Sequence, residues 1–501
     1  MSLIDIMLRL FNVDTLLLTA GGTLAGILLG AIPGLSGPIG VAILLPLTFG
    51  MDPVNGLLLL GGIYMGATVG GSISAILLNT PGTGEAACTA LDGFPMAAQG
   101  RAKEALFYSI FSSFVGGLAG VLALLFLTPV LASFALKFGP PEMFMLGLAG
   151  LTIVGSLSGS RLSKGFFAVA FGILISLVGT DINTGQYRFT FGMRDLRAGI
   201  DLIPLIVGFF AIAEMVTLTR TGAGSFVDAP LQNIPFFRVV RDVTRRWTLI
   251  LRTSLLGVGI GILPGTGGAV AAFVGYGEAK RVSKSPQTFG KGNPEGIIAA
   301  ESANNAAVGG SLIPLLALGI PGSATAAILY GALTIQGLVP GPELLTDYRD
   351  ITLTFMSGML ITVFVMLAVG LISARLFAPI LKLNVVYIVP AVIIFSAIGV
   401  YSVRNSLLDL VLMMVFGLIG ILFKKLEIPP APVLLGSILG PMVELNFGRT
   451  LRFAEFDHQH FLVYLVSRPI SAVLLVFLAL LVFANARRII QSRKSESTHE
   501  T

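Results

Sequence analysis

Two glycine–proline segments set in apolar sequence decide the fold: GGSISAILLNTPGTGEA at Gly70–Ala86 and GGSLIPLLALGIPGSATA at Gly309–Ala326. Pro81 and Pro321 mark the corresponding points of the two segments, about 240 residues apart. Each segment is apolar, then small and polar, then apolar again. This pattern predicts a helix that is interrupted and then continues, once in each half of the chain.

A second pair of segments precedes the first at a similar offset. The residues GAIPGLSG lie at Gly30–Gly37 and GILPGTGG at Gly261–Gly268, with Pro33 and Pro264 about 231 residues apart. Apolar segments that are interrupted at matching places in two halves are typical of a transporter, and they point to its substrate site.

The composition places the chain in a lipid bilayer. Apolar residues make up 54% of the 501 residues, charged residues 12%, and the mean hydropathy is +0.90, whereas soluble domains carry roughly 25% charged residues. The net charge of +6 falls in short loops between apolar runs, which argues against a nucleic-acid partner and favours cytoplasmic loops. Cys88 is the sole cysteine, so neither an internal disulfide nor a cysteine-based metal site is predicted. We also predict no metal site of another kind and no cofactor.

We therefore predict an all-α polytopic membrane protein built of two repeats, each with a re-entrant hairpin and a broken transmembrane helix. The charged loops fit about eleven crossings plus two hairpins, with the N-terminus outside and the C-terminus inside. The first half is predicted at 1–199, with hairpin 16–49 and broken helix 56–95. A span and a basic cytoplasmic linker follow at 200–246, and the second half at 247–445 has hairpin 247–277 and broken helix 296–337. Residues 446–501 are predicted to form an outer loop, the last span and a cytoplasmic tail.

Loop charges predict that the two repeats are inverted. The loop after the first hairpin is acidic (Asp52), but the loop after the second is basic (Lys280–Lys291). The loop after the first broken helix is basic (Arg101–Lys103), and the one after the second is acidic (Glu343–Asp350). Opposite membrane orientation predicts this exchange, although parallel repeats whose loop charges diverged remain an alternative.

Interrupted helices leave backbone groups unpaired inside the bilayer, and small polar residues at the breaks can pair with a bound carboxylate instead. A helix N-terminus also favours an anion, while freed carbonyls can hold Na⁺. The alternative is a set of kinks or hinges without a ligand. The predicted substrate-binding residues are Ser36, Gly37, Asn79, Thr80, Gly82, Thr83, Gly84, Thr266, Gly267, Gly268, Gly322, Ser323 and Thr325.

A second group of polar residues precedes the second break. Glu301, Asn304 and Asn305 lie in AAESANNAAVGG, and polar side chains inside a membrane segment are functional candidates. We predict that they bind the coupling ion. The alternative is a capping or loop role near the inner face.

The chain resembles the large membrane subunit of the tripartite tricarboxylate transporters, the TctA family. The resemblance covers essentially the whole chain and rests on Asn79–Ala102, Gly261–Lys284 and Pro294–Pro342. It implies a permease of the bacterial inner membrane that works with a small membrane subunit (TctB-like) and a periplasmic solute-binding protein (TctC-like). It also implies uptake of a carboxylate driven by a gradient of Na⁺ or H⁺ rather than by ATP, without a cofactor and without enzymatic activity.

Two other classes of function are alternatives to a transporter. An anion channel or a structural membrane scaffold would also be apolar and helical, but inverted repeats with hairpins favour alternating access. The sequence does not distinguish between tricarboxylates and related organic acids. It also leaves the stoichiometry and the oligomeric state open.

Overall fold

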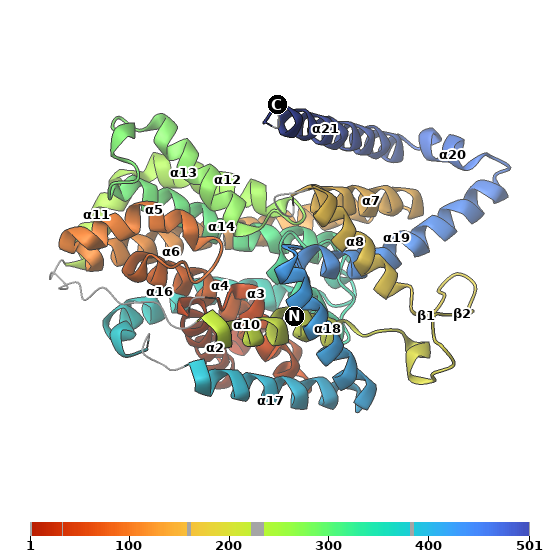
Figure 1. Cartoon of the computed structure of the whole chain (residues 1–501), viewed down its shortest axis with the longest axis horizontal. Helices are drawn as coiled ribbons and strands as arrows, with labels where there is room; N and C mark the ends of the chain where they lie inside the picture. The colour runs from red at the N-terminus through yellow and green to blue at the C-terminus, as the bar shows by residue number, and fades with distance from the viewer. Residues whose placement is uncertain (1–2, 33, 158–161, 222–234, 381–384, 500–501) are drawn as a thin grey trace.

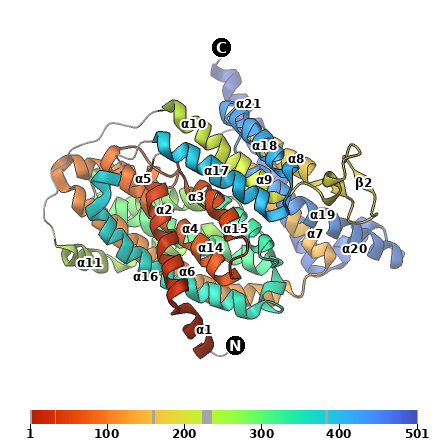
Figure 2. The same cartoon turned by 90° about the horizontal axis from the view of Figure 1, so that it is seen from below.

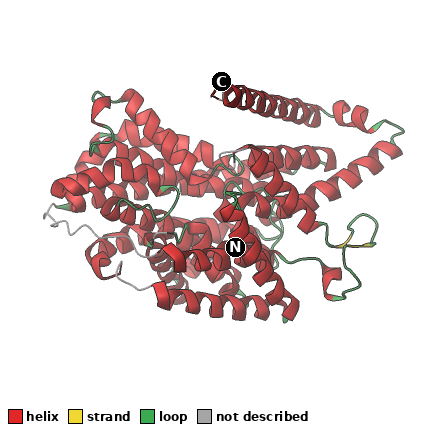
Figure 3. Ribbon diagram, viewed as in Figure 1, coloured by secondary structure: helices red, strands yellow, loops and turns green. Residues whose placement is uncertain are grey.

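The computed structural model describes residues 3–32, 34–157, 162–221, 235–380 and 385–499, and these residues are almost entirely helical (Figure 3). Two short strands, β1 (Gly179–Thr180) and β2 (Tyr187–Arg188), pair antiparallel in a loop. The helices of the first half are α1 (Leu3–Leu10), α2 (Val13–Ala31), α3 (Gly37–Leu44), the 3₁₀ turn η1 (Leu45–Thr48), α4 (Pro53–Leu78), α5 (Ala86–Met96), the π-helical η2 (Ala97–Arg101), α6 (Ala102–Ala135), α7 (Pro140–Leu157) and α8 (Leu162–Ser176).

The remaining helices follow the strands. They are η3 (Asp195–Ala198), α9 (Leu202–Ile206), the π-helical η4 (Val207–Ile212), α10 (Ala213–Thr221), α11 (Phe236–Arg245), α12 (Trp247–Ile262), α13 (Gly267–Val282), η5 (Pro286–Thr288), α14 (Pro294–Leu318), α15 (Ala324–Ile335), η6 (Pro342–Leu345), α16 (Arg349–Ile380), α17 (Val385–Arg404), α18 (Leu407–Lys425), α19 (Ala431–Phe456), α20 (Phe461–Ser467) and α21 (Pro469–His499).

The chain is a multi-pass membrane protein. In the described part of the chain, six helices are long and apolar enough to cross a bilayer: Val13–Ala31, Pro53–Leu78, Ala86–Ala135, Arg349–Ser373, Leu407–Lys425 and Ala431–Phe456. Helix α20 and the described start of α21 form a further apolar pair, bent by 109° at the break between them. Shorter apolar helices, α3 and α12 among them, accompany the long ones, so the count of about eleven crossings stays a prediction.

Two groups of helices build the body of the protein. Helices α2, α4, α6, α14 and α16 pack together in one bundle, while α7, α8 and α19 pack together to one side of it (Figure 2). Helix α21 lies along α7 at the edge of the second group (Figure 1). The most apolar window of α4 is 94% buried, and residues 296–317 of α14 are all buried. The polar side chains of these two helices therefore face protein rather than lipid.

Glycines allow the helices of the bundle to approach closely. A Cβ on Gly26 of α2 would lie 2.4 Å from the carbonyl oxygen of Ile63 in α4. A Cβ on Gly257 of α12 would lie 2.2 Å from the carbonyl oxygen of Ala303 in α14. Small residues bring helix backbones together in membranes because packing, rather than hydrophobic burial, drives their association. The pairs α2–α4 and α12–α14 are thus built alike.

Helices α4 and α14 end in the same backbone conformation. Asn79 follows α4 with φ 54°, and Gly319 follows α14 with φ 71°, and both angles lie in the left-handed region. The two helix ends differ in whether backbone N–H groups bond to their last carbonyls. The N–H groups of Gly319 and Ile320 bond to the carbonyls of Leu315 and Pro314, whereas, in the described break after Asn79, no backbone N–H bonds to the last turn of α4.

Candidate substrate and ion sites

A line of polar side chains joins α4 to α14 in the centre of the bundle. The Tyr64 hydroxyl lies 3.1 Å from the Ser311 Oγ, and the Thr68 hydroxyl donates to the Asn305 Oδ1 at 2.9 Å. Ser72, one turn further along α4, donates to Glu301. Residue numbers rise along α4 while they fall along α14, so the two helices run antiparallel where these side chains meet.

The first polar cluster lies at the break after α14, and we call it the second-break cluster (Gly37, Tyr64, Ser323, Thr325). Ser323 caps α15 by accepting from the Ala326 N–H at 3.1 Å, and its hydroxyl lies 2.9 Å from the Tyr64 hydroxyl. A Cβ on Gly37, the first residue of α3, would lie 3.6 Å from the Thr325 Oγ1 and 4.0 Å from the Tyr64 ring. The first hairpin therefore meets the second break.

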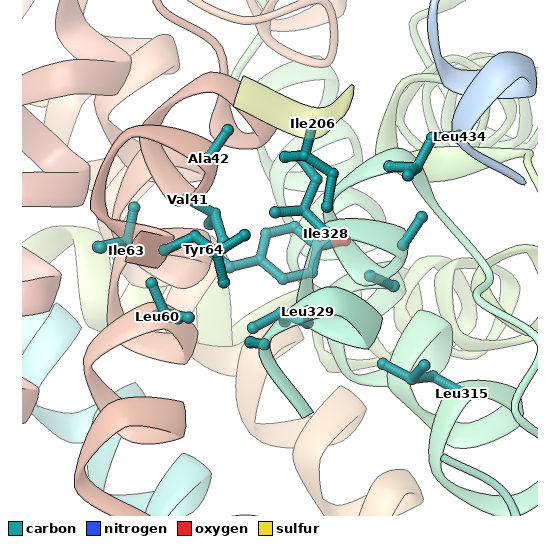
Figure 4. Packing of buried hydrophobic residues seen from close by; sticks show 14 of the residues in the cluster. Val41, Ala42, Leu60, Ile63, Tyr64, Ile206, Leu315, Ile328, Leu329 and Leu434 are labelled. Atoms are coloured by element: carbon teal, nitrogen blue, oxygen red, sulfur yellow. The ribbon is translucent and has the colours of Figure 1, made fainter. Parts of the chain in front are cut away.

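The Tyr64 ring fixes this cluster in place. It packs among Val41 of α3 and Ile328 and Leu329 of α15 (Figure 4). A buried tyrosine is held by its apolar ring and needs a hydrogen-bond partner for its hydroxyl. Both conditions are met, because the hydroxyl bonds between α14 and the start of α15.

The reciprocal arrangement occurs at the break after α4, and we call it the first-break cluster (Glu85, Gly268, Asn304). A Cβ on Gly268, near the start of α13, would lie 2.2 Å from the Asn304 Oδ1 and 2.9 Å from the Glu85 Cγ. The second hairpin therefore meets the first break. Asn304 is 1% exposed, yet neither its Oδ1 nor its Nδ2 has a hydrogen-bond partner. A buried amide without a protein partner is costly, so both of its polar atoms are available to a ligand or a water molecule.

Glu301 lies one turn before Asn305 on α14 and is completely buried. Its carboxylate accepts from Ser72, from Thr89 at 2.5 Å and from Ser113 at 2.8 Å. These donors come from α4, α5 and α6. We call this group the Glu301 cluster. Among the described residues no Lys or Arg pairs with Glu301, so hydroxyls are its partners in a site where a charge is expensive.

Gly82 and Gly322 occupy matching positions in the two breaks. The Gly82 N–H bonds to the Gly71 carbonyl at 3.3 Å, and the Gly322 N–H bonds to the Ser311 carbonyl at 3.2 Å. A Cβ on Gly82 would lie 1.9 Å from the Gly30 carbonyl oxygen, and one on Gly322 would lie 2.2 Å from the Gly261 carbonyl oxygen. Close backbone approach thus requires glycine at both sites. Neither glycine has a positive φ, so space rather than backbone conformation requires glycine here.

Asp92 anchors α5 to the loop between α13 and α14. Its Oδ1 accepts from the backbone N–H groups of residues 290–293 at 2.8–3.1 Å, and its Oδ2 accepts from the Tyr276 hydroxyl at 2.9 Å. The helix that leaves the first break is therefore tied to the second hairpin. Asp92 thus holds α5 against α13 and the loop before α14.

The other predicted residues have local roles or open surroundings. The Thr266 hydroxyl donates to its own hairpin at the carbonyl of Ile260, and Thr80 donates to the carbonyl of Leu78. Thr83 is buried against Gly71 and accepts from the Ala86 N–H at 3.4 Å. A Cβ on Gly84 or on Gly267 would meet no atom within 4 Å. Ser36 precedes α3 without a capping bond from its side chain, and Asn79 ends α4 in the left-handed conformation.

Sequence reasoning missed five polar partners of these clusters: Tyr64, Ser72, Thr89, Ser113 and Ser311. A signal was available for two of them. At the offset of about 240 residues, Ser72 corresponds to Leu312 and Thr89 to Leu329. The other repeat packs with leucine at each of these positions, so a hydroxyl there indicates a role other than packing.

These features define a multi-pass membrane protein whose central helices are interrupted at buried polar clusters. The chain belongs to the tripartite tricarboxylate transporter TctA family, whose model matches residues 16–435. Members of that family are membrane components of transporters made of several subunits, and they are not enzymes.

Two relatives come from Agrobacterium vitis. An uncharacterized 52.8 kDa protein in the TAR-I ttuC' 3' region is 38% identical over 465 residues, which cover 92% of this chain and 91% of the relative. An uncharacterized protein in the TAR-II ttuC' 3' region is 36% identical over 235 residues, which cover 46% of this chain and 96% of the relative. No solved structure matches the chain.

Proposed function

We propose that this protein imports a carboxylate, a tricarboxylate or related organic acid, across the bacterial inner membrane by alternating access. A gradient of Na⁺ or H⁺ drives the uptake, a periplasmic binding protein delivers the substrate, and a small membrane subunit completes the permease. One observation carries the proposal: each hairpin tip contacts the break of the other half, Gly37 beside Thr325 and Gly268 beside Glu85. Sites shared between two halves open and close when the halves move.

The second-break cluster is the proposed carboxylate site. The hydroxyls of Tyr64 and Ser323 bond to each other, and the Thr325 hydroxyl lies beside Gly37. Among the described residues, the hydrogen bonds of Tyr64 and Ser323 involve no carboxylate. The starts of α3 and α15 both border the cluster and present partial positive charge. Gly322 brings backbone close to the same point. These groups favour an anion without a buried Lys or Arg.

The first-break cluster is the proposed cation site. Glu85 supplies negative charge, the buried Asn304 supplies an unpaired carbonyl oxygen, and the last turn of α4 presents carbonyls that no N–H of the described break closes. Oxygen ligands of this kind suit Na⁺. The residues Asn79, Thr80, Gly82, Thr83, Gly84, Gly267 and Gly268 frame this site in the proposal. Glu301 and Asn305 lie beside it on α14 and respond to the ion.

We further propose that the two repeats are inverted in the membrane. The antiparallel contact of α4 with α14 supports this, because corresponding helices of inverted repeats cross the membrane in opposite directions. Single cysteines at Arg101 and Lys284 should react only from the cytoplasm, and those at Asp52 and Asp347 only from outside. Labelling of Asp52 and Lys284 from one face contradicts the inversion.

Uptake by purified protein in proteoliposomes tests the transport function itself. We expect saturable uptake of radiolabelled carboxylate that requires an imposed Na⁺ or H⁺ gradient and is stimulated by the loaded binding protein. Steady ohmic currents without saturation would favour an anion channel. A folded, reconstituted complex that neither transports nor conducts would favour a structural scaffold.

A further inference from the structure

A basic cavity opens at the end of the hairpin α12–α13 that lies away from the polar clusters. It has a volume of about 870 Å³ and lies between the start of α12, the end of α13 and the loop before α14. Five basic side chains line it, against the single carboxylate of Glu295. The basic residues are Arg245, Arg246, Arg252, Lys284 and Lys291.

Part of this positive charge has no protein partner. Arg246 pairs with Asp242 and lies 3.7 Å from Glu295, and Arg252 lies 3.3 Å from Glu278. Within the described residues, neither Lys284 nor Lys291 forms an ion pair. A cavity with this balance of charge favours an anion that brings several oxygen atoms.

The surroundings of the cavity are apolar and exposed, as at a membrane surface. On α12, the exposed fraction is 61% for Trp247, 49% for Leu251 and 62% for Leu255. Phe237 of the short amphipathic helix α11 is 82% exposed. Tryptophan is enriched at the level of lipid headgroups. The buried face of α11 packs on α6 through Val239 and Val243, which leaves Phe237 exposed beside the cavity. Exposed apolar side chains therefore flank the basic cavity, as they would at a membrane surface.

We propose that this cavity binds the phosphate headgroup of an anionic phospholipid of the cytoplasmic leaflet. The phosphate lies among Lys284, Lys291 and Arg245, while the acyl chains follow the apolar face of α12. Basic cavities between helices on the cytoplasmic side recognise anionic lipids through this combination of charge and apolar contact. The site is separate from the break clusters, and only its assignment to the cytoplasmic leaflet rests on the proposed topology.

Native mass spectrometry of the purified full-length protein tests the proposal. Phosphatidylglycerol should bind, and phosphatidylcholine should not. The double substitution Lys284→Ala with Lys291→Ala should weaken phosphatidylglycerol binding about tenfold or more, given the typical effect of two charges near a membrane surface. The matched control, Lys280→Ala with Lys425→Ala, removes the same charge from exposed lysines outside the cavity and should leave binding unchanged.

Three results would overturn the assignment. One is an equal loss of binding in the control variant, which indicates nonspecific attraction. Another is binding of inorganic phosphate but not of phosphatidylglycerol, which indicates a free anion as the ligand. The third is displacement of the lipid by citrate at the concentration used in the uptake assay, which indicates that the cavity is a vestibule for the substrate.

Discussion

Gly61 of α4 and Glu301 of α14 occupy corresponding positions in the two halves, about 240 residues apart, yet their surroundings have opposite chemistry. A Cβ on Gly61 would meet the Met359 sulfur and the Phe355 ring of α16. Glu301 instead accepts hydrogen bonds from three hydroxyls. The repeat reproduces the helix scaffold in both halves but places a charge in one. A buried carboxylate within the repeated long helix is therefore proposed for ion coupling on α14 and not on α4.

Tyr64 and Asn304 show the same contrast at the clusters. They also correspond at the offset of about 240 residues. The Tyr64 hydroxyl is paired within the protein, whereas both polar atoms of the Asn304 amide are buried and unpaired. The Tyr64 hydroxyl of the second-break cluster is thus paired within the protein, but the Asn304 amide of the first-break cluster is not. This difference is why we assign the cation to the first break.

The largest expected effect is loss of the folded protein when either close backbone contact is blocked. Gly82→Ala and Gly322→Ala place a methyl group within about 2 Å of a backbone carbonyl oxygen, which neither helix can relieve by a rotamer change. We expect a lower yield of folded protein and a thermal midpoint reduced by several degrees, measured in detergent.

Gly84→Ala is the matched control in the same break. A Cβ on Gly84 meets nothing within 4 Å, and Gly84 has no positive φ. Its thermal midpoint should stay near that of the unaltered protein. An equal loss of stability in all three variants would show that the first break is sensitive to any added side chain. It would contradict the claim that close backbone contact is what requires glycine at Gly82 and Gly322.

A smaller effect is expected from Glu301→Gln, which keeps the shape of the side chain but removes its charge. The ion concentration for half-maximal uptake should rise about tenfold or more, because a charge-assisted contact to the ion or its proton is lost. Uptake into proteoliposomes at varied Na⁺ and at varied pH measures this. An altered yield with unchanged ion dependence would give Glu301 a structural role.

An effect on stability is expected at the anchor of α5. Asp92 has an alanine, Ala332, as its counterpart in the second half, so only the first break has this anchor among the described residues. Asp92→Ala leaves several N–H groups of residues 290–293 unpaired and should cost about 2 kcal/mol, with Asp92→Asn costing less. Thermal unfolding measures both. Gln99→Ala, which removes one exposed hydrogen bond to the same loop, should be nearly neutral, and a loss equal to that of Asp92→Ala would argue against the anchor.

The sequence predicts the helical membrane class and the family correctly, because composition and the glycine–proline segments depend on local sequence alone. The breaks after α4 and α14 were located by Pro81 and Pro321 for the same reason. The crossed pairing was not predictable. Gly268 meets Glu85 only because the two halves pack against each other, and nothing local to either residue encodes that contact.

The partners of Glu301 were missed for a similar reason. Ser72, Thr89 and Ser113 are single hydroxyls on three different helices, and each is unremarkable in its own apolar segment. A serine or threonine in a membrane helix can satisfy itself by bonding to the carbonyl one turn back, so its presence alone carries little information. The long-range packing of α4, α5 and α6 on α14 converts them into a site.

The central claim is that the second-break cluster binds the carboxylate and the first-break cluster binds the ion, and a paired measurement on Ser323→Ala and Asn304→Ala tests it most directly. Linkage makes each ligand alter the affinity of the other, so the KM for carboxylate is measured both at limiting and at saturating ion. At saturating ion, Ser323→Ala should keep a KM raised about tenfold, whereas Asn304→Ala should recover the normal KM. A defect of Asn304→Ala that persists at saturating ion, together with recovery of Ser323→Ala, would contradict the assignment.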